Sequence, residues 1–144
     1  MSKKTTVITG AGTGIGRAIA HRLATDGHHL ALMARNTERL IQTAEEAREM
    51  GAPEVTVHSC DIQDRDAVET AFSAAHATHG DLTGLVANSG VGGPNADGPD
   101  DRFMEIVQTN LIGTYNSLRA AQRYLAKGPE ARHLIAIASI LGRF

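Results

Sequence analysis

Short apolar runs alternate with amphipathic stretches along most of this sequence. Apolar residues that recur every three or four positions predict helices, and short uninterrupted apolar runs predict buried strands. Strands are predicted over about residues 5–8, 30–33, 55–59, 82–88 and 134–139. Helices are predicted between them, from Ile15 up to Gly27, over 36–50, over 64–78, and from Phe103 up to Gly128. This alternation predicts an α/β fold with a doubly wound parallel sheet of the Rossmann type. The expected strand order is 3-2-1-4-5, in a single domain over residues 1–144.

The side-chain pattern also predicts which faces are buried. Val55 and Val57 alternate with polar residues, which predicts a partly exposed edge strand. The continuous apolar run at 134–139 is typical of a buried strand, but in the expected order it lies at the sheet edge, where these 144 residues would leave it exposed. In the long helix, the apolar stripe that includes Phe103 and Leu111 is expected to face the core.

Composition narrows the class of function. The net charge of −2 over 144 residues offers no basic region for nucleic acid. The single cysteine, Cys60, cannot form an internal disulfide, which predicts a cytoplasmic protein. No apolar run suits a signal peptide or a membrane span, so no membrane partner is expected. His76 and His79 share a predicted helix without a third ligand in view, so we expect a solvated face there and no metal.

A glycine-rich turn follows the first predicted strand. Residues 9–16 read Thr-Gly-Ala-Gly-Thr-Gly-Ile-Gly, and a helical pattern begins within them. Gly10 permits a sharp exit from the strand, Gly14 leaves room for a phosphate or ribose, and Gly16 lets the helix pack closely on the sheet. The helix N-terminus favours an anion such as a pyrophosphate. An ordinary tight turn is the simpler alternative.

Each predicted strand ends at or beside a glycine or a polar residue. These residues are Gly10, Arg35, Asp61, Asn88 and Ser139. Because ligands of such sheets bind beyond the carboxyl ends of the strands, the five residues predict one site.

The region around Arg35 indicates which dinucleotide binds. In NAD-binding folds an acidic residue about twenty positions after the glycines holds the ribose hydroxyls. Here Ala34 and Arg35 occupy that region, so no carboxylate repels a 2′-phosphate and a guanidinium can bind it. NADP(H) is therefore the preferred cofactor, with NAD(H) still possible. The alternative is that Arg35 is a solvated surface residue.

The spacing Thr-Gly-x-x-x-Gly-x-Gly resembles the signature of the short-chain dehydrogenase/reductase family. The resemblance implies an oxidoreductase that moves a hydride between a nicotinamide cofactor and a small carbonyl compound or secondary alcohol. It implies that Thr13, Gly14, Ile15 and Gly16 form the cofactor turn. It also implies a homodimer or homotetramer.

Three later motifs support the resemblance and imply roles for their residues. Asp61-Ile62 corresponds to the pair that binds the adenine amino group and packs on the ring. Asp61 could instead cap a helix, although Asp64 is better placed to do so. Ala87-Asn88-Ser89-Gly90 resembles Asn-Asn-Ala-Gly, so Asn88 would tie the central strands together, and Ser89-Gly90 would line the cofactor ribose. A turn-forming asparagine is the alternative for Asn88.

Two residues are candidates for the chemistry. Thr109-Asn110-Leu111-Ile112-Gly113 resembles the family's Asn-x-x-Gly motif, whose asparagine holds a water in a proton relay. A hydrogen-bonded core asparagine is the alternative for Asn110. The resemblance implies that Ser139 donates a hydrogen bond to the substrate carbonyl and stabilises developing negative charge.

The family's Tyr-x-x-x-Lys motif does not occur in these 144 residues. Arg119 lies four residues after Tyr115, and Gly128 lies four residues after Tyr124. The chain is therefore expected to be the N-terminal portion of a family domain, incomplete at its C-terminus and inactive by itself. The alternative is a short non-catalytic nucleotide-binding module that senses redox state or binds a partner. A methyltransferase-like nucleotide fold is a third possibility, which Asn110 and Ser139 disfavour.

Overall fold

The computed structural model describes residues 2–92 and 101–139, and its centre is a five-stranded parallel sheet. The strands lie in the predicted order β3-β2-β1-β4-β5, which confirms the Rossmann-type topology. Their bounds are β1 (Thr5–Thr9), β2 (His29–Ala34), β3 (Val55–Ser59), β4 (Gly84–Ala87) and β5 (His133–Ala136).

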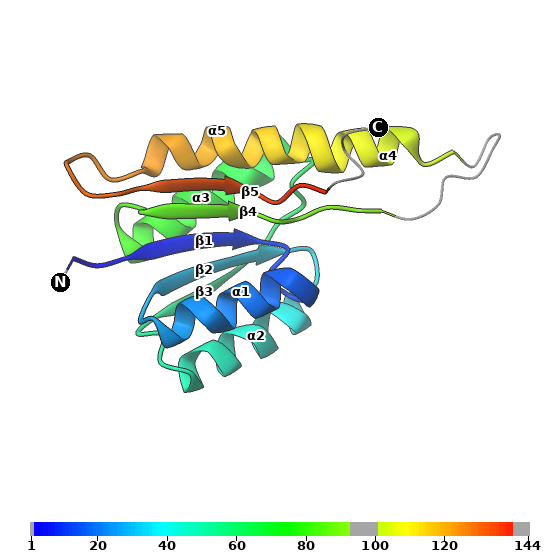
Figure 1. Ribbon diagram of the computed structural model, residues 1–144. Helices are drawn as coiled ribbons and strands as arrows, with labels where there is room; N and C mark the ends of the chain where they lie inside the picture. The colour runs from blue at the N-terminus through cyan, green and yellow to red at the C-terminus, as the bar shows by residue number, and fades with distance from the viewer. Residues whose placement is uncertain (1, 93–100, 140–144) are drawn as a thin grey trace.

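Helices cover both faces of the sheet (Figure 1). They are α1 (Gly14–Thr25), α2 (Thr37–Glu49), α3 (Arg65–His79), α4 (Phe103–Ile106), the π-helical stretch η1 (Val107–Gly113) and α5 (Thr114–Tyr124). Helices α1 and α2 pack on one face, and α3 and α5 pack on the other. This arrangement leaves the carboxyl ends of the strands at one edge of the sheet, where the site lies.

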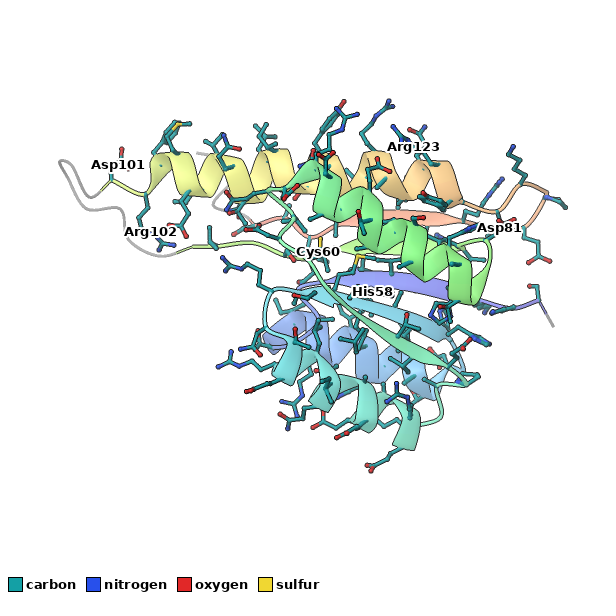
Figure 2. All side chains as sticks on the ribbon, turned by 180° about the vertical axis from the view of Figure 1, so that it is seen from behind. His58, Cys60, Asp81, Asp101, Arg102 and Arg123 are labelled. Carbon is teal, nitrogen blue, oxygen red and sulfur yellow. The ribbon has the colours of Figure 1, made fainter. Side chains whose placement is uncertain are left out.

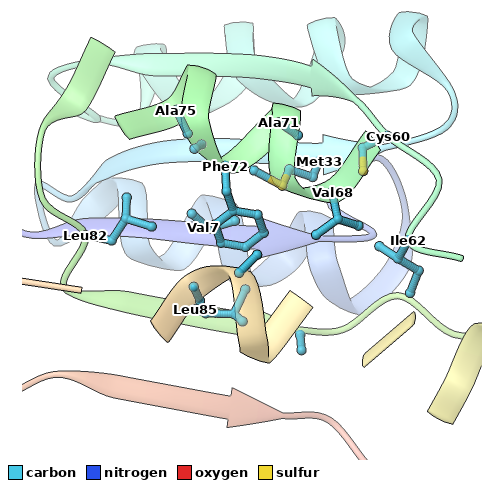
Figure 3. Close-up of a cluster of buried hydrophobic side chains, with 14 residues drawn as sticks. Val7, Met33, Cys60, Ile62, Val68, Ala71, Phe72, Ala75, Leu82 and Leu85 are labelled. Atoms are coloured by element: carbon cyan, nitrogen blue, oxygen red, sulfur yellow. The ribbon is translucent and has the colours of Figure 1, made fainter. Parts of the chain in front are cut away.

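Apolar side chains of α3 form part of the core between this helix and the sheet. Val68, Ala71, Phe72 and Ala75 are all buried on α3. Figure 3 shows the Phe72 ring among apolar side chains that come from the helix and from the sheet. Helix α3 begins where Asp64 accepts hydrogen bonds from the N–H groups of the first turn, both at 3.0 Å, so Asp64 is the N-cap.

One burial prediction is confirmed and another is wrong. All four residues of β5 are exposed at the edge of the sheet, as expected, although their apolar run is typical of a buried strand. Phe103 and Leu111 are 57% and 63% exposed, because the helical stretch before α5 extends beyond the sheet (Figure 1). The long helix also ends at Tyr124, and Leu125 is already extended, so Gly128 does not end it.

The prediction of a solvated histidine face fails for His79. The His79 side chain is fully buried at the end of α3, whereas the His76 side chain remains 40% exposed. Among the described residues, no helix has both the length and the apolar character needed to cross a membrane.

Candidate functional site

A cavity of about 370 Å³ lies at the carboxyl ends of the first four strands. Its lining includes these predicted residues: Gly10, Thr13, Gly14, Ile15, Arg35, Asp61, Ile62, Asn88, Ser89 and Gly90. The sheet topology brings them together from segments that are up to about eighty residues apart in the sequence. Gly16, Asn110 and Ser139 are predicted site residues that do not line this cavity.

The glycine turn has the backbone geometry that its sequence predicts. Gly10 and Gly14 have positive φ angles of 65° and 52°, which side chains disfavour. A Cβ at Gly14 would contact nothing within 4 Å among the described residues, so this glycine borders open space. A Cβ at Gly16 would lie 2.1 Å from the carbonyl oxygen of Gly10. Gly16 therefore permits close packing beneath the turn, and Gly14 leaves room for a ligand above it.

The N-terminus of α1 borders the cavity and is suited to an anion. Thr13 is the N-cap residue, but its side chain makes no capping hydrogen bond, and the first turn contains no acidic residue. The first intrahelical bond runs from the N–H of Arg17 to the carbonyl of Thr13, so the N–H groups before it have no partner within the helix. The helix dipole adds partial positive charge at this end, which would stabilise a phosphate.

A network around Thr9 joins β1 to the segment after β4. The Thr9 hydroxyl oxygen accepts hydrogen bonds from the N–H groups of Asn88 and Ser89, each at 3.0 Å. The Asn88 side-chain amide donates to the carbonyls of Thr9 and Gly10 at 3.3 and 3.4 Å. Asn88 thus connects the two central strands, and it holds Ser89 and Gly90 against the cavity.

Positive charge gathers at the end of the cavity beside β2. Arg35 follows β2 directly and is exposed, and Arg39 lies in the first turn of α2, where the Asn36 side chain caps the helix. The hydrogen bond from Arg102 holds the pKa of the Glu105 carboxyl below its usual range, and the positive charges of Arg102 and Arg35 lower it further. The positive charge of Arg35 therefore acts on the Glu105 carboxylate in α4.

The segment after β3 forms the opposite wall. The Asp61 carboxylate accepts a hydrogen bond from the N–H of Gln63 at 3.0 Å, and the residue is exposed. Ile62 is only 6% exposed. Its side chain lies so close to η1 that a Cβ at Gly113 would be 2.6 Å away from it. Asp64, and not Asp61, caps α3, which leaves part of the Asp61 carboxylate available to a ligand.

Asn110 lies in η1, next to the cavity and not in its lining. Its side chain exchanges two hydrogen bonds with the backbone of Val91, each at 2.8 Å. The residue is exposed, so the alternative of a core asparagine is wrong. The adjacent Thr109 is buried and accepts a hydrogen bond of 2.8 Å from the side-chain amide of Gln63. The π-helical stretch η1 is thus hydrogen-bonded to the segment after β4 through Asn110 and to the segment after β3 through Thr109. These two segments line the cavity.

Ser139 lies three residues beyond the end of β5 and is exposed. It lies at the carboxyl edge of the sheet, because Ile137 donates a backbone hydrogen bond to Ala87 at 2.9 Å and extends the pairing of β5 with β4. Four of the five strand-end residues therefore line one cavity, and Ser139 lies on the same edge outside it.

The cavity also contains residues that the sequence reasoning missed. Arg39, Gln63 and Thr109 line it, and none follows a strand directly. Arg39 could have been found from its spacing, because it lies four residues after Arg35 in the first turn of a predicted helix. Nothing in the sequence pairs Gln63 with Thr109, because the contact depends on how α3 and η1 pack.

Comparison with known proteins finds relatives that are reductases or dehydrogenases. An indene-carboxyl-CoA reductase of Mycobacterium tuberculosis, (5R,7aS)-5-hydroxy-7a-methyl-1-oxo-2,3,5,6,7,7a-hexahydro-1H-indene-carboxyl-CoA reductase, is 33% identical over 142 residues. The alignment covers 97% of this chain and 54% of the reductase. This chain thus spans about half the length of the curated relatives that it matches.

Two solved structures have similar backbones. An alcohol dehydrogenase from the archaeon Thermococcus sibiricus, complexed with 5-hydroxy-NADP, is 37% identical with a TM-score of 0.78. The match covers 85% of this chain and 53% of that one. An NAD+-bound xylitol dehydrogenase is 30% identical with a TM-score of 0.87, over 97% of this chain and 54% of that one.

The family comparison covers nearly the whole chain. The model of the short chain dehydrogenases matches residues 4–144, which contain every predicted site residue. Together with the sheet order and the glycine turn, this match shows that the chain belongs to the short chain dehydrogenase family.

Proposed function

We propose that the chain binds NADP(H) in the cavity beside Gly14. We further propose that the protein transfers a hydride between NADP(H) and a carbonyl compound or secondary alcohol. The observation that carries the proposal is one cavity that combines the glycine turn, the N-terminus of α1 and two arginines, Arg35 and Arg39. Relatives with NADP-type and NAD+ ligands support a nicotinamide dinucleotide as the cofactor class.

The pyrophosphate would lie on the turn at the start of α1. Gly14 offers the open space, and the N–H groups of Gly14 and Ile15 offer donors that the helix itself does not use. Thr13 adds a hydroxyl that makes no capping bond. Gly10 and Gly16 allow this turn to form without crowding the sheet.

The adenosine end would lie between β2 and the segment after β3. Arg35 would bind the 2′-phosphate, with Arg39 from the same wall, and no carboxylate follows β2 directly to repel it. Asp61 would accept a hydrogen bond from the adenine amino group, and Ile62 would pack on the ring. This arrangement supports NADP(H) over NAD(H).

The reactive end would lie beyond Ser89 and Gly90, toward Ser139. The nicotinamide ring, when bound, supplies or accepts the hydride. The Ser139 hydroxyl would donate a hydrogen bond to the substrate carbonyl oxygen and stabilise its developing negative charge. Asn110 would hold a water for proton transfer while its side chain keeps Val91 in position.

A proton donor is also needed to protonate the developing alkoxide. Tyr115 is exposed on α5, and the Tyr124 ring lies 5.1 Å from the imidazole of His76, near the other end of the sheet. Neither tyrosine has a lysine four residues later. We therefore propose that these 144 residues bind the cofactor but do not reduce a ketone by themselves.

Calorimetric titration of the 144-residue chain with NADPH and NADH tests the proposal. NADPH is expected to bind more tightly, and Arg35→Ala should weaken NADPH binding about tenfold to a hundredfold, the usual value of a charge-assisted hydrogen bond. NADH binding should change little in this variant. Arg22→Ala is the matched control, because Arg22 is exposed at the far end of α1. Tighter binding of NADH than of NADPH would overturn the proposed preference.

A kinetic assay separates the enzyme proposal from a non-catalytic module. Ketone-dependent NADPH oxidation by the 144-residue chain, verified by intact mass, would contradict the proposed need for a further proton donor. Failure of both dinucleotides to bind would contradict the cofactor proposal itself.

We propose a homodimer or homotetramer as the assembled form. Apolar side chains are exposed along α4, η1 and α5, where Phe103, Met104, Leu111 and Tyr115 are each more than half exposed. Light scattering coupled to size-exclusion chromatography tests this, and Leu111→Lys should shift the mass toward the monomer. A monomeric wild-type chain across the micromolar range would overturn it.

A further inference from the structure

Two histidines and a glutamate meet at the amino-terminal edge of the sheet, at the end opposite the cofactor cavity. His29 is the first residue of β2, Glu54 directly precedes β3, and His79 is the last residue of α3. The pairing of β2 with β3 brings the first two together, because the N–H of Leu30 donates to the carbonyl of Glu54 at 2.9 Å. Figure 2 shows Asp81, two residues after His79, at the opposite end of the sheet from Cys60.

The three side chains direct their ligand atoms at one point. The Nδ1 atoms of His29 and His79 lie 3.7 and 3.5 Å from the same carboxylate oxygen, Oε2 of Glu54. One ligand atom from each residue lies within 4.8 Å of the other two. In a tetrahedral zinc site with bonds of about 2.0–2.1 Å, neighbouring ligand atoms are about 3.4 Å apart. Small side-chain rotations would therefore bring these atoms to coordination distance.

His79 carries a buried nitrogen that none of the described residues satisfies. Its side chain is completely buried, yet within residues 2–92 and 101–139 its Nδ1 has no hydrogen-bond partner, and the same is true of the buried Nδ1 of His29. Buried polar atoms in folded proteins are almost always paired, so two such atoms on one carboxylate need an explanation. A cation shared by the three side chains would satisfy both nitrogens.

The other ring nitrogen of His79 makes a hydrogen bond of the kind that orients a metal-binding histidine. His79 Nε2 lies 2.8 Å from the hydroxyl oxygen of Thr56, which lies 2.8 Å from Nε2 of His58. If a metal occupies Nδ1 of a neutral imidazole, the proton is on Nε2, which then donates to Thr56. The Thr56 hydroxyl can in turn donate to Nε2 of His58, so both protons in this series of hydrogen bonds have an acceptor.

The cluster is accessible to solvent on the side of Glu54. The Lys3 ammonium donates to the His79 backbone carbonyl at 2.6 Å, so it lies on the backbone side of the residue. The Glu54 side chain, 44% exposed, gives a cation a route from solvent.

From this geometry we infer that His29, Glu54 and His79 form a binding site for a divalent transition metal of the zinc type. The site would have two imidazole nitrogens, one carboxylate oxygen and positions open to water. It lies apart from the cofactor cavity and shares no residue with it. Its role would be structural, because it would join the start of β2, the start of β3 and the end of α3.

Titration of the tag-free 144-residue chain with zinc chloride after chelator treatment and dialysis tests the inference. One equivalent is expected to bind, and the melting temperature should rise with the zinc concentration. Cobalt(II) should give a visible absorption band of a nitrogen- and oxygen-ligated ion that zinc displaces. Glu54→Gln and His29→Asn, both at partly exposed side chains, should weaken binding more than about 100-fold, beyond the usual effect of losing an outer-shell partner.

Two further variants locate the site. Thr56→Val should weaken zinc about 10- to 100-fold and retain a cobalt band, as an outer-shell partner would. His76→Asn is the matched control. His76 also lies on α3 and pairs with a carboxylate at 3.1 Å, and its replacement should leave zinc affinity unchanged. If zinc does not bind the wild-type chain, or binds Glu54→Gln and His29→Asn as tightly as the wild type, the inference is wrong.

Discussion

Strands β1 and β5 belong to the same parallel sheet but differ completely in burial. All five residues of β1 are buried, whereas all four residues of β5 are exposed. Strand β1 lies between β2 and β4 beneath helices on both faces, and β5 pairs with β4 alone among the described residues. Apolar side chains therefore predict that a segment forms a strand, but its position in the sheet decides how much that segment stabilises the fold.

The largest effect is expected beside the end of β1, at Gly16. A Cβ there would lie 2.1 Å from the Gly10 carbonyl oxygen and 2.7 Å from Nδ2 of Asn88. Gly16→Ala should therefore lower the free energy of unfolding by about 4 kcal/mol or more, because the backbone itself must move. Urea denaturation followed by circular dichroism measures this. Gly92→Ala is the control, because a Cβ at Gly92 meets nothing within 4 Å among the residues that the structure describes. Equal stability of the two variants would contradict the close packing described.

A matched pair of leucines tests the comparison directly. Leu85 on β4 is completely buried, and its register partner Leu134 on β5 is 42% exposed. Leu85→Ala should cost about 2–5 kcal/mol of unfolding free energy, and Leu134→Ala about 0.5 kcal/mol or less. Similar losses in both variants would show that β5 is covered in solution.

The two acidic residues after β3 should separate stability from binding. Asp64→Ala removes the N-cap of α3 and should cost about 1 kcal/mol, with NADPH affinity unchanged. Asp61→Ala should weaken NADPH binding and have a smaller effect on stability, because among the described residues Asp61 accepts a hydrogen bond only from the Gln63 N–H. Denaturation and calorimetry on both variants measure this, and a reversed pattern would refute the assigned roles.

The smallest effect concerns pH and the histidines beside β3. Burial lowers the pKa values of His58 and His79 below the usual value, so the unfolded chain binds protons that the folded chain does not. Their contribution to stability is complete above about pH 6.5 and is lost as the pH falls through the lowered values. Urea midpoints measured with chelator should fall between pH 7.5 and 5.5. His58→Gln should flatten this decline, and an unchanged slope would exclude His58 as a source.

The fold could be predicted from the sequence where local pattern and sheet position agree. The alternating run that contains Val55 and Val57 predicted an edge strand, and β3 is one. The exposed edge position of β5 followed from the predicted strand order, whereas the exposure of Phe103 could not be predicted, because it depends on which layer covers that segment. The sequence pattern therefore indicates how much burial suits a segment. Whether the segment is in fact buried depends on whether another layer of the fold covers it.

The site was predictable to the extent that it lies at strand ends. Parallel strands bring their carboxyl ends to one edge, so residues such as Asn88 were found from the order of elements. Arg39, Gln63 and Thr109 lie on helices or before them, and their inward direction depends on helix packing. The meeting of His29 with His79 depends on strand register and on where α3 ends, which no spacing in the sequence reveals.

The Thr9 hydroxyl has a consequence for the mutational tolerance of this chain. One oxygen atom accepts from two consecutive backbone N–H groups, those of Asn88 and Ser89. Valine has nearly the same shape but no acceptor, so it would leave two half-buried donors unpaired at the carboxyl edge of the sheet. A saturation library at position 9, selected for folded protein, should therefore retain threonine and serine and lose valine, so at this position hydrogen-bonding capacity restricts the sequence more than hydrophobicity or volume does.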